Sequence, residues 1–566
     1  MLKKALKLFF QNKLRFLVII LGSISWIVTV FKSGLNYPFG IGFWGANGHD
    51  GVWHIALANS LARGSLEMPT FAGETLKNYH IGFDLLLVLI NRLIGIPINV
   101  LYFQIIPPIL AVLIGILTYK LVISWTKPDR AALWATFFVY FGGSFGFALG
   151  KGESAFWSQQ AISTLINPPF ALSLIFILLG LVSLLKYQKS FSIWDLAFSI
   201  LFFGVLIEIK AYAGILALGS LLVSGVWRVI REKKYDYLFV FLGSTVLSLV
   251  LFLPLNSGSG NLLVFQPFWF LETMMGLTDR VGWLKFGEAM VNYRAGGVWV
   301  KALAAYGAAF MVFLVGNLGT RLVFVKQIIG KLDNLRIFIL SIILGGILIP
   351  MLFLQKGTPW NTIQFFYYSL FFSAILAGIA AADILKRLNT TIFRIIVVLG
   401  ILTLTLPTSA IALKDVYLPA RPPAMISRAE LEALNFLAKQ ENGVVLTYPF
   451  DEFKAKDAIS NPPRPLYLYA SAAYVSAYAN KPIYLEDEIN LDITGYDWRG
   501  RRKKVFEFIG QTDVIEARQF LEENKIKYLY LVKKSSPLVG EELKLGSGQL
   551  GITKIFDNSE VSIYRN

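Results

Sequence analysis

The chain has 566 residues, of which 55% are hydrophobic, 14% are aromatic and only 16% are charged, with a mean hydropathy of +0.59. This composition excludes an ordinary soluble globular protein and indicates a polytopic membrane protein, while the lack of cysteine excludes disulfides, thiolate nucleophiles and Cys-ligated metal sites. The net charge of +17 comes from residues 1–412, which hold 32 basic and 15 acidic side chains, because residues 413–566 hold 21 of each.

The basic residues of the first part lie in short gaps between apolar runs, which is typical of membrane topology, so no nucleic acid is expected as a partner. A spanning helix needs about 20 mostly apolar residues. The first run follows a basic N-terminus without a signal-peptide cleavage site, so we interpret it as an uncleaved span with a cytoplasmic N-terminus. About 11 spans are predicted: 14–31, 100–120, 131–149, 166–185, 193–209, 211–229, 238–255, 299–318, 337–354, 362–384 and 395–412.

The positive-inside rule places five gaps rich in Lys and Arg in the cytoplasm. Segment 81–96 is also apolar, but a separate crossing there would place the basic gap 120–130 outside and invert every later span. We therefore interpret 81–96 as an outer half-helix or as the broken start of the second span. The large loops 32–80 and 256–298 and the tail 413–566 then lie on the same, extracytoplasmic side.

The tail alternates helical and strand patterns. A helix is expected from Ser427 to Lys439, a strand at 444–448, a helix followed by a strand over 513–532, and a hairpin near the C-terminus. These patterns predict a soluble α/β domain that is long enough to have its own core.

All three histidines, His49, His54 and His80, lie in or at the end of the first outer loop, together with Asp50 and Asp84. Asp50 and His54 are four residues apart, so they share one side of a predicted interfacial helix. Asp50 is a candidate general base, because an acceptor hydroxyl that attacks a sugar carbon must lose its proton; the alternative is a helix cap. His54 contacts substrate or is a polar tip at the interface. A divalent metal bound by His49, Asp50, His54 and His80 is a further alternative, based on ligand type alone.

Three short motifs resemble those of bacterial C-type (GT-C) membrane glycosyltransferases. Asp50-Gly51-Val52-Trp53-His54 is similar to their Asp-x-x-x-His loop helix, while Asn167-Pro168-Pro169 and Gln364-Phe365-Phe366-Tyr367-Tyr368 each open a span. The resemblance covers residues 1–412, including a first span, a long outer loop, a seven-span module and a second large outer loop. It implies a polytopic α-helical membrane protein, GT-C-like with about 11 spans, followed by the C-terminal α/β domain.

The loop 256–298 lacks the Asp-x-Asp motif of the oligosaccharyltransferase branch. The chain therefore resembles the members that use single-sugar polyprenyl-phosphate donors, in which the loop aspartate, matched here by Asp50, is the proposed base. The resemblance implies no particular cofactor, and a bound divalent metal remains an alternative.

A phosphate-linked sugar donor at the outer membrane surface is expected to be bound by cationic side chains, because the leaving phosphate gains negative charge as the bond breaks. Lys210, which lies between two apolar runs, is the first candidate, with a local contact to Glu208 as the alternative. Arg294 and Lys356 in outer loops are further phosphate or sugar contacts, or interfacial anchors. The expected substrate-binding residues are thus His54, His80, Lys210, Arg294, Lys356 and Gln364.

The leading interpretation is a multi-pass enzyme of the cell membrane that moves a sugar from a polyprenyl-phosphate-linked donor to an acceptor glycan, lipid or protein on the outer face. A secondary transporter or lipid flippase is the alternative, although the sequence has no internal repeat of the kind such proteins often show. A non-catalytic scaffold that binds envelope glycans through its tail is a third possibility.

Overall fold

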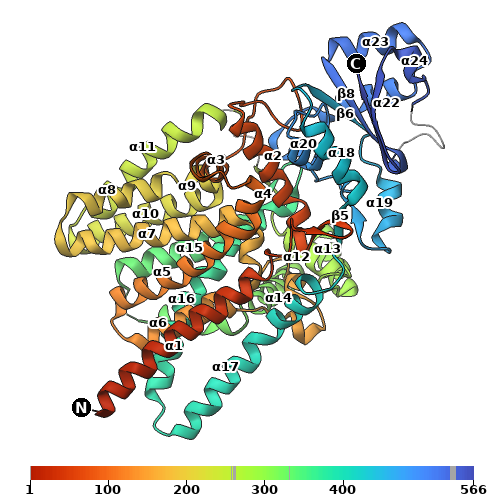
Figure 1. Ribbon diagram of the computed structural model, residues 1–566. Helices are drawn as coiled ribbons and strands as arrows, with labels where there is room; N and C mark the ends of the chain where they lie inside the picture. Colours follow the sequence, from red (N-terminus) through yellow and green to blue (C-terminus); the bar gives the residue numbers. More distant parts are fainter. Residues whose placement is uncertain (1, 257, 259–262, 331, 536–542) are drawn as a thin grey trace.

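The apolar runs form helices, because a helix satisfies every backbone hydrogen bond within its own segment and can therefore lie in hydrocarbon. The computed structural model describes residues 2–256, 258, 263–330, 332–535 and 543–566, with side chains from residue 13 onward. Figure 1 shows a body of long helices with the N-terminus at one end and the C-terminal tail at the other.

Within these ranges, nine helical segments are long and apolar enough to cross a membrane. Each overlaps one of the predicted spans, so the chain is a multi-pass helical membrane protein. Their helices are α5 (Ile106–Thr126), α6 (Asp129–Phe141), α7 (Pro168–Ser190), α10 (Ala211–Glu232), α11 (Asp236–Asn256), α14 (Trp299–Leu318), α15 (Asn334–Leu352), α16 (Gln364–Arg387) and α17 (Thr391–Ala412).

The other two predicted spans are helical as well. α1 (Leu2–Ile27) packs along α5 and α6. Segment 193–209 is divided at Val205 into α8 (Ile193–Gly204) and α9 (Leu206–Ile209), which pack against α7 and α11. Eleven crossings remain our prediction, because these two segments do not meet the same length and composition test.

The ambiguous segment 81–96 forms α3 (Gly82–Ile94), which ends at Gly95 in a left-handed conformation with φ 72°. Its 13 residues are about 20 Å long, short of the roughly 30 Å of hydrocarbon, so α3 is a half-helix. α4 (Ile98–Val100) and a π-helical turn at Leu101–Ile105 connect α3 to α5.

The first outer loop contains α2 (Asp50–Ala62), which was expected to lie at the membrane interface. That expectation is wrong, because nearly every side chain of α2 after Asp50 is buried. The tail helix α20 (Tyr474–Ala479) covers it, and the Asn59 amide donates a hydrogen bond to the Ala477 carbonyl at 2.8 Å. α2 is therefore a core helix between α3 and the tail.

The tail contains the predicted helices and strands in an α/β arrangement. Its four-stranded sheet has the order β6-β8-β10-β9, with β6 parallel to β8 and β10 antiparallel to β8 and β9. The strands are β6 (Val444–Thr447), β8 (Ile526–Val532), β9 (Thr553–Asp557) and β10 (Val561–Arg565). The other tail helices are α18 (Arg428–Ala438), α19 (Glu452–Ile459), α21 (Glu488–Thr494), α22 (Trp498–Ile509), α23 (Val514–Glu523) and α24 (Ser547–Leu550).

A second sheet joins the tail to the first outer loop. Its order is β1-β2-β5-β7, in which β1 (Asn36–Tyr37) and β2 (Gly40–Phe43) come from the loop. β5 (Ala424–Ser427) and β7 (Arg464–Pro465) come from the tail, and β2 pairs antiparallel with β5. The tail is therefore fixed on the loop by main-chain hydrogen bonds.

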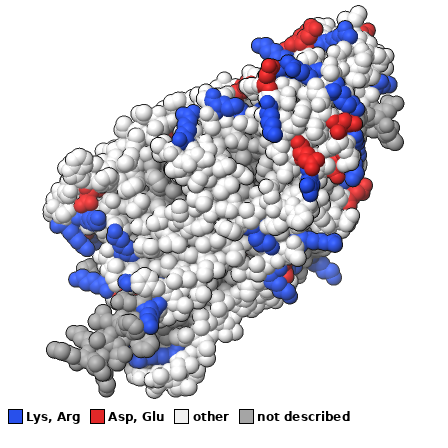
Figure 2. Space-filling view, viewed as in Figure 1, with Lys and Arg blue, Asp and Glu red and all other residues white. Residues whose placement is uncertain are grey.

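The second large loop forms β3 (Leu263–Phe265), α12 (Trp269–Gly276) and α13 (Leu284–Ala295). β3 pairs with β4 (Phe353–Gln355), which follows α15. Figure 2 shows an almost uncharged surface between the two ends of the molecule, while Lys, Arg, Asp and Glu are mixed over the tail. This uncharged surface is the part that suits hydrocarbon.

Candidate active site

A cavity of about 330 Å³ lies where the first outer loop, several helix ends and the tail meet. The first residues of α10 and α16 and the last residues of α11 line it, so it lies at one end of the spans. α21 of the tail closes it from above with Asn490 and Ile493. Its polar lining residues are Asp50, His54, Asn78, Tyr79, His80, Asn167, Lys210, Tyr212, Asn256, Gln355, Asn361, Gln364 and Asn490.

Asp50 is the first residue of α2, and its side chain is exposed to the cavity. It is not the helix cap: His49 occupies that position, and no side chain caps the helix. The Asn167 amide donates a hydrogen bond to Asp50 Oδ2 at 3.4 Å, while Asn167 Oδ1 accepts from the Phe170 backbone at 3.0 Å and caps α7. One asparagine thus joins the start of a span to the candidate base.

Lys210 lies at the break between α9 and α10, where the backbone is extended. Its side chain is only 6% exposed and lines the same cavity as Asp50. Burial lowers the pKa of Lys210 to about 8, and the charge of Asp50 partly offsets this effect. Glu208 does not pair with it, because Glu208 accepts a hydrogen bond from the Ile81 backbone at 3.3 Å.

His54 and His80 occupy the same wall. His54 Nδ1 lies 2.8 Å from Asp84 Oδ1, and both residues are buried, so His54 is not a polar tip at the interface. His80 stacks on Tyr79 with 4.7 Å between ring centroids. Burial lowers the pKa of His80, and the nearby Lys210 and His54 add to this effect. Three nitrogen-bearing side chains, those of His54, His80 and Lys210, therefore line the same cavity.

Gln364 belongs to a chain of polar contacts along another wall. Its amide donates to Asn361, the Asn361 amide donates to Gln355 Oε1 at 3.0 Å, and the Tyr212 hydroxyl donates to the same oxygen at 2.9 Å. Sequence reasoning singled out only Gln364 here. The other three carry no sequence signal, because they are single polar residues whose importance depends on which helix ends meet.

The cavity also has an apolar wall. Ile207, Phe252 and Phe365 contribute to it, together with Ile215 and Leu263, which are 46% and 45% exposed. Ile215 lies on α10 and Phe252 on α11, so spanning helices contribute to this wall.

Arg294 and Lys356 do not line this cavity. Arg294 lies on α13 and forms an ion pair with Glu272 at 2.6 Å, which satisfies its charge away from Lys210. Lys356 is exposed in a neighbouring hollow with Asp492 and Arg499. The expectation that Arg294 joins Lys210 at one phosphate is therefore corrected.

The four suggested metal ligands do not converge. The His49 ring is hydrogen-bonded to Ser471 of the tail and lies edge-on to Tyr469, whereas His54 is bound to Asp84. Among the residues with described side chains, no group of three or more His, Asp or Glu is arranged to hold a metal ion. The metal set His49, Asp50, His54 and His80 is therefore wrong as a geometry.

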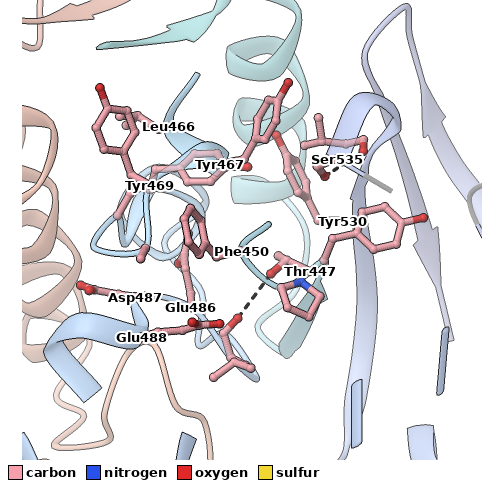
Figure 3. Close-up of a pocket in the computed structure, with 17 residues that line it drawn as sticks. Thr447, Phe450, Leu466, Tyr467, Tyr469, Glu486, Asp487, Glu488, Tyr530 and Ser535 are labelled. Atoms are coloured by element: carbon pink, nitrogen blue, oxygen red, sulfur yellow. Dashed lines mark hydrogen bonds between the residues drawn. The ribbon is translucent and has the colours of Figure 1, made fainter. Parts of the chain in front are cut away.

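A smaller hollow lies inside the tail, where Figure 3 shows tyrosines and a row of three acidic residues around it. Its volume of about 40 Å³ holds a few water molecules and no sugar. The acidic side chains serve the fold: Glu486 accepts hydrogen bonds from the Val475 and Ser476 backbone at 2.8 and 3.1 Å, and Asp487 caps α21. This hollow is a structural feature of the tail.

No protein-family model and no curated protein matches the sequence. Solved structures do match the fold. An archaeal oligosaccharyltransferase, AglB from Archaeoglobus fulgidus in complex with an inhibitory peptide and a dolichol-phosphate, aligns with a TM-score of 0.54 at 12% identity, covering 92% of this chain and 70% of that one. The arabinofuranosyltransferase AftD from Mycobacteria aligns with a TM-score of 0.56 at 12% identity, covering 97% of this chain and 41% of that one. The chain therefore shares the fold of these two transferases, which agrees with the fold class expected from the sequence.

Proposed function

We propose that this protein is an integral-membrane glycosyltransferase that moves a sugar from a polyprenyl-phosphate-linked donor to an acceptor hydroxyl on the outer face of the membrane. One observation carries the proposal: a single cavity brings together the carboxylate of Asp50, the buried ammonium of Lys210 and an apolar wall to which the spanning helices contribute. A membrane-anchored sugar phosphate has three matching parts, namely a polar sugar, an anionic phosphate and an apolar chain.

The apolar wall suits the carrier chain. Ile215 and Leu263 line the cavity and are nearly half exposed, and Ile215 lies on a spanning helix, so we expect a prenyl chain to lie along this wall while its headgroup occupies the polar part of the cavity. The oligosaccharyltransferase of similar fold was solved with a dolichol-phosphate. We extend the same class of lipid, a polyprenyl phosphate, to this chain.

The chemistry follows from the two charged groups. The acceptor oxygen forms a bond to the anomeric carbon while its proton passes to Asp50. The bond from that carbon to the phosphate oxygen breaks, and its electron pair leaves with the oxygen, so the phosphodiester becomes a polyprenyl phosphate with one more negative charge. Lys210 opposes that added charge in a site where burial excludes most water, which strengthens the interaction.

The outer location of the cavity rests on charge. Basic side chains occupy the ends of the spans that lie away from the tail, for example Lys186 and Lys189 on α7 and Arg231 on α10. The positive-inside rule places those ends in the cytoplasm, and the cavity and the tail outside. Protease added to sealed, right-side-out vesicles is expected to remove the tail, and a protected tail would invert this topology.

The transporter alternative expects an ionisable site near the bilayer midplane. Here the polar residues of the cavity lie at the ends of α10, α11 and α16, which favours an interfacial enzyme. A scaffold without catalysis stays distinguishable by experiment, because it predicts no transfer from any donor.

Asp50→Asn in the full-length protein, reconstituted in liposomes with a panel of polyprenyl-phosphate-linked sugars, tests the proposal. Loss of a general base is expected to lower transfer by about 10²- to 10⁴-fold. Glu74→Gln is the matched control, since Glu74 is an exposed carboxylate of the same loop outside the cavity. Unchanged transfer by Asp50→Asn would refute the base, and a wild-type protein that transfers no sugar would refute the enzyme.

A further inference from the structure

The imidazole of His54 has close contacts on several sides. Asp84 lies 2.8 Å from its Nδ1, Tyr102 stacks on it at 5.7 Å, and Phe83 meets its edge at 5.7 Å. His54 is 3% exposed and Asp84 is fully buried, yet His54 still contributes to the cavity surface. The ring therefore has one permitted orientation.

The side chain of Asp84 contacts His54 through one carboxylate oxygen. Its Oδ1 faces His54, and within the described residues its buried Oδ2 has no hydrogen-bond partner. Burial raises the pKa of Asp84, while the contact with His54 opposes that shift. A buried carboxylate is costly unless it is paired, so the sequence maintains an expensive residue at this position to act on one imidazole.

The backbone around the pair is fixed as well. Asp84 lies in the first turn of α3, and Glu208 accepts a hydrogen bond from Ile81 at the start of that helix. Glu208 lies two residues before Lys210, so the element that carries Asp84 is tied to the element that carries the cation. His54 in turn lies one helical turn after Asp50 on α2.

We propose that Asp84 and His54 form a dedicated anion-binding pair, in which Nδ1–H of His54 donates to Asp84 and the opposite nitrogen, Nε2, donates to a phosphate oxygen of the lipid carrier. Asp84 is the positioning residue, and His54 contacts the ligand. This inference rests on the proposed function for the identity of the ligand. It adds a second donor beside Lys210, fixed by a carboxylate that the sequence motif does not contain.

The change of charge during the reaction supports this role. When the sugar leaves, the phosphate gains one negative charge and the hydrogen bond from Nε2 becomes stronger. The other titratable or charged groups around His54 are Asp50, Tyr79, His80, Tyr102 and Lys210.

Binding of farnesyl phosphate to the full-length protein in nanodiscs tests the inference without requiring turnover, and farnesol measures the contribution of the apolar chain. Asp84→Asn keeps an oxygen that can accept from Nδ1 but removes the negative charge. This variant is expected to weaken binding of farnesyl phosphate at least about tenfold relative to wild type, with farnesol unaffected.

A double-mutant cycle separates positioning from folding. His54→Gln alone should weaken binding to a similar extent, and Asp84→Asn should cost nothing further in its presence. The control is Asp195→Asn, at the start of α8 and outside the cavity. Equal affinity of wild type and Asp84→Asn for farnesyl phosphate, or additive losses in the cycle, would each overturn the inference. If Asp84→Asn does not fold, the affinities of the double variant and of His54→Gln for farnesyl phosphate are compared instead. Equal affinities are expected, and a weaker affinity of the double variant would overturn the inference.

Failure of the proposed function gives a different result. A wild-type protein that transfers no sugar but binds farnesyl phosphate with this dependence on Asp84 would refute the enzyme and retain the anion-binding pair. A protein that transfers sugar with an unchanged affinity in Asp84→Asn would do the reverse.

Discussion

Replacing Lys210 with methionine is expected to make the protein more stable and less active. Methionine keeps an unbranched side chain of similar length and removes the charge. Lys210 is 6% exposed, and none of the described carboxylates forms an ion pair with it, since Glu208 is hydrogen-bonded to the Ile81 backbone. The substitution therefore leaves no buried partner unsatisfied.

The expected size of the stability change follows from the lysine pKa. Burial lowers that pKa from 10.5 to about 8, which corresponds to a cost of about 3 kcal/mol for keeping the ammonium charged in the folded protein. The cost is present below about pH 8 and declines as the pH rises above it, because the folded protein then holds the neutral amine. At pH 7, Lys210→Met is expected to raise the free energy of unfolding by up to this amount.

Transfer should fall at the same time, because the leaving phosphate loses a charged hydrogen bond. Such bonds contribute about 1.5–3 kcal/mol, which corresponds to roughly 10- to 150-fold in rate. The assay is sugar transfer in liposomes together with the thermal unfolding temperature. Lys285→Met, an exposed lysine on α13, is the matched control and should change neither. Unchanged transfer in Lys210→Met, or lost transfer with a lower unfolding temperature, would refute the reasoning.

Two further predictions concern the start of α7 and the tail. Asn167→Asp keeps a capping oxygen but places a second carboxylate beside Asp50. Sugar transfer should therefore fall at least about tenfold, while the free energy of unfolding changes by less than about 1 kcal/mol. Transfer at the wild-type rate would show that the contact between Asn167 and Asp50 is unimportant. In the tail, burial raises the pKa of Glu430 and Glu486 to about 8 and that of Asp487 to about 7. The folded tail therefore holds protons that the unfolded tail releases above about pH 4.5, and the stability of the tail should decline as the pH rises from 5.5 to 8.5. Limited proteolysis of the full-length protein measures this decline, and equal cleavage rates at the two pH values, after correction for the activity of the protease, would contradict it.

The predicted positions of the long helices depend only on local properties of the chain. A bilayer requires about 20 apolar residues in a row and no unsatisfied backbone, so hydropathy alone located α5, α7, α10 and α11. The tail strands were recognisable because short runs rich in β-branched, aromatic and other apolar residues are also a local property of the chain. Helix α2 was misjudged as interfacial because an apolar face does not reveal whether lipid or protein covers it.

The composition of the cavity wall depends on packing between distant segments. Asn167 opens α7 whatever lies next to it, but it contacts Asp50 only because loop and span meet. Arg294 and Lys210 looked equivalent in sequence. In the structure Arg294 forms an ion pair with Glu272, whereas Glu208, the acidic residue near Lys210 in sequence, accepts a hydrogen bond from the Ile81 backbone. Asp84 had no motif to distinguish it, and its role depends on the single orientation of the His54 ring.

The sequence by itself determined that the chain crosses a membrane many times, which gaps carry the positive charge, that a soluble α/β tail follows, and that polar chemistry gathers in the first outer loop. Only the tertiary structure decided that β2 pairs with β5 of the tail, that α21 closes the cavity, and that Asp50 and Lys210 line the same wall. The physical reason is that solvation by lipid or water acts on each residue separately and leaves a periodic pattern, whereas a site is made by side chains whose proximity is set by how whole elements pack.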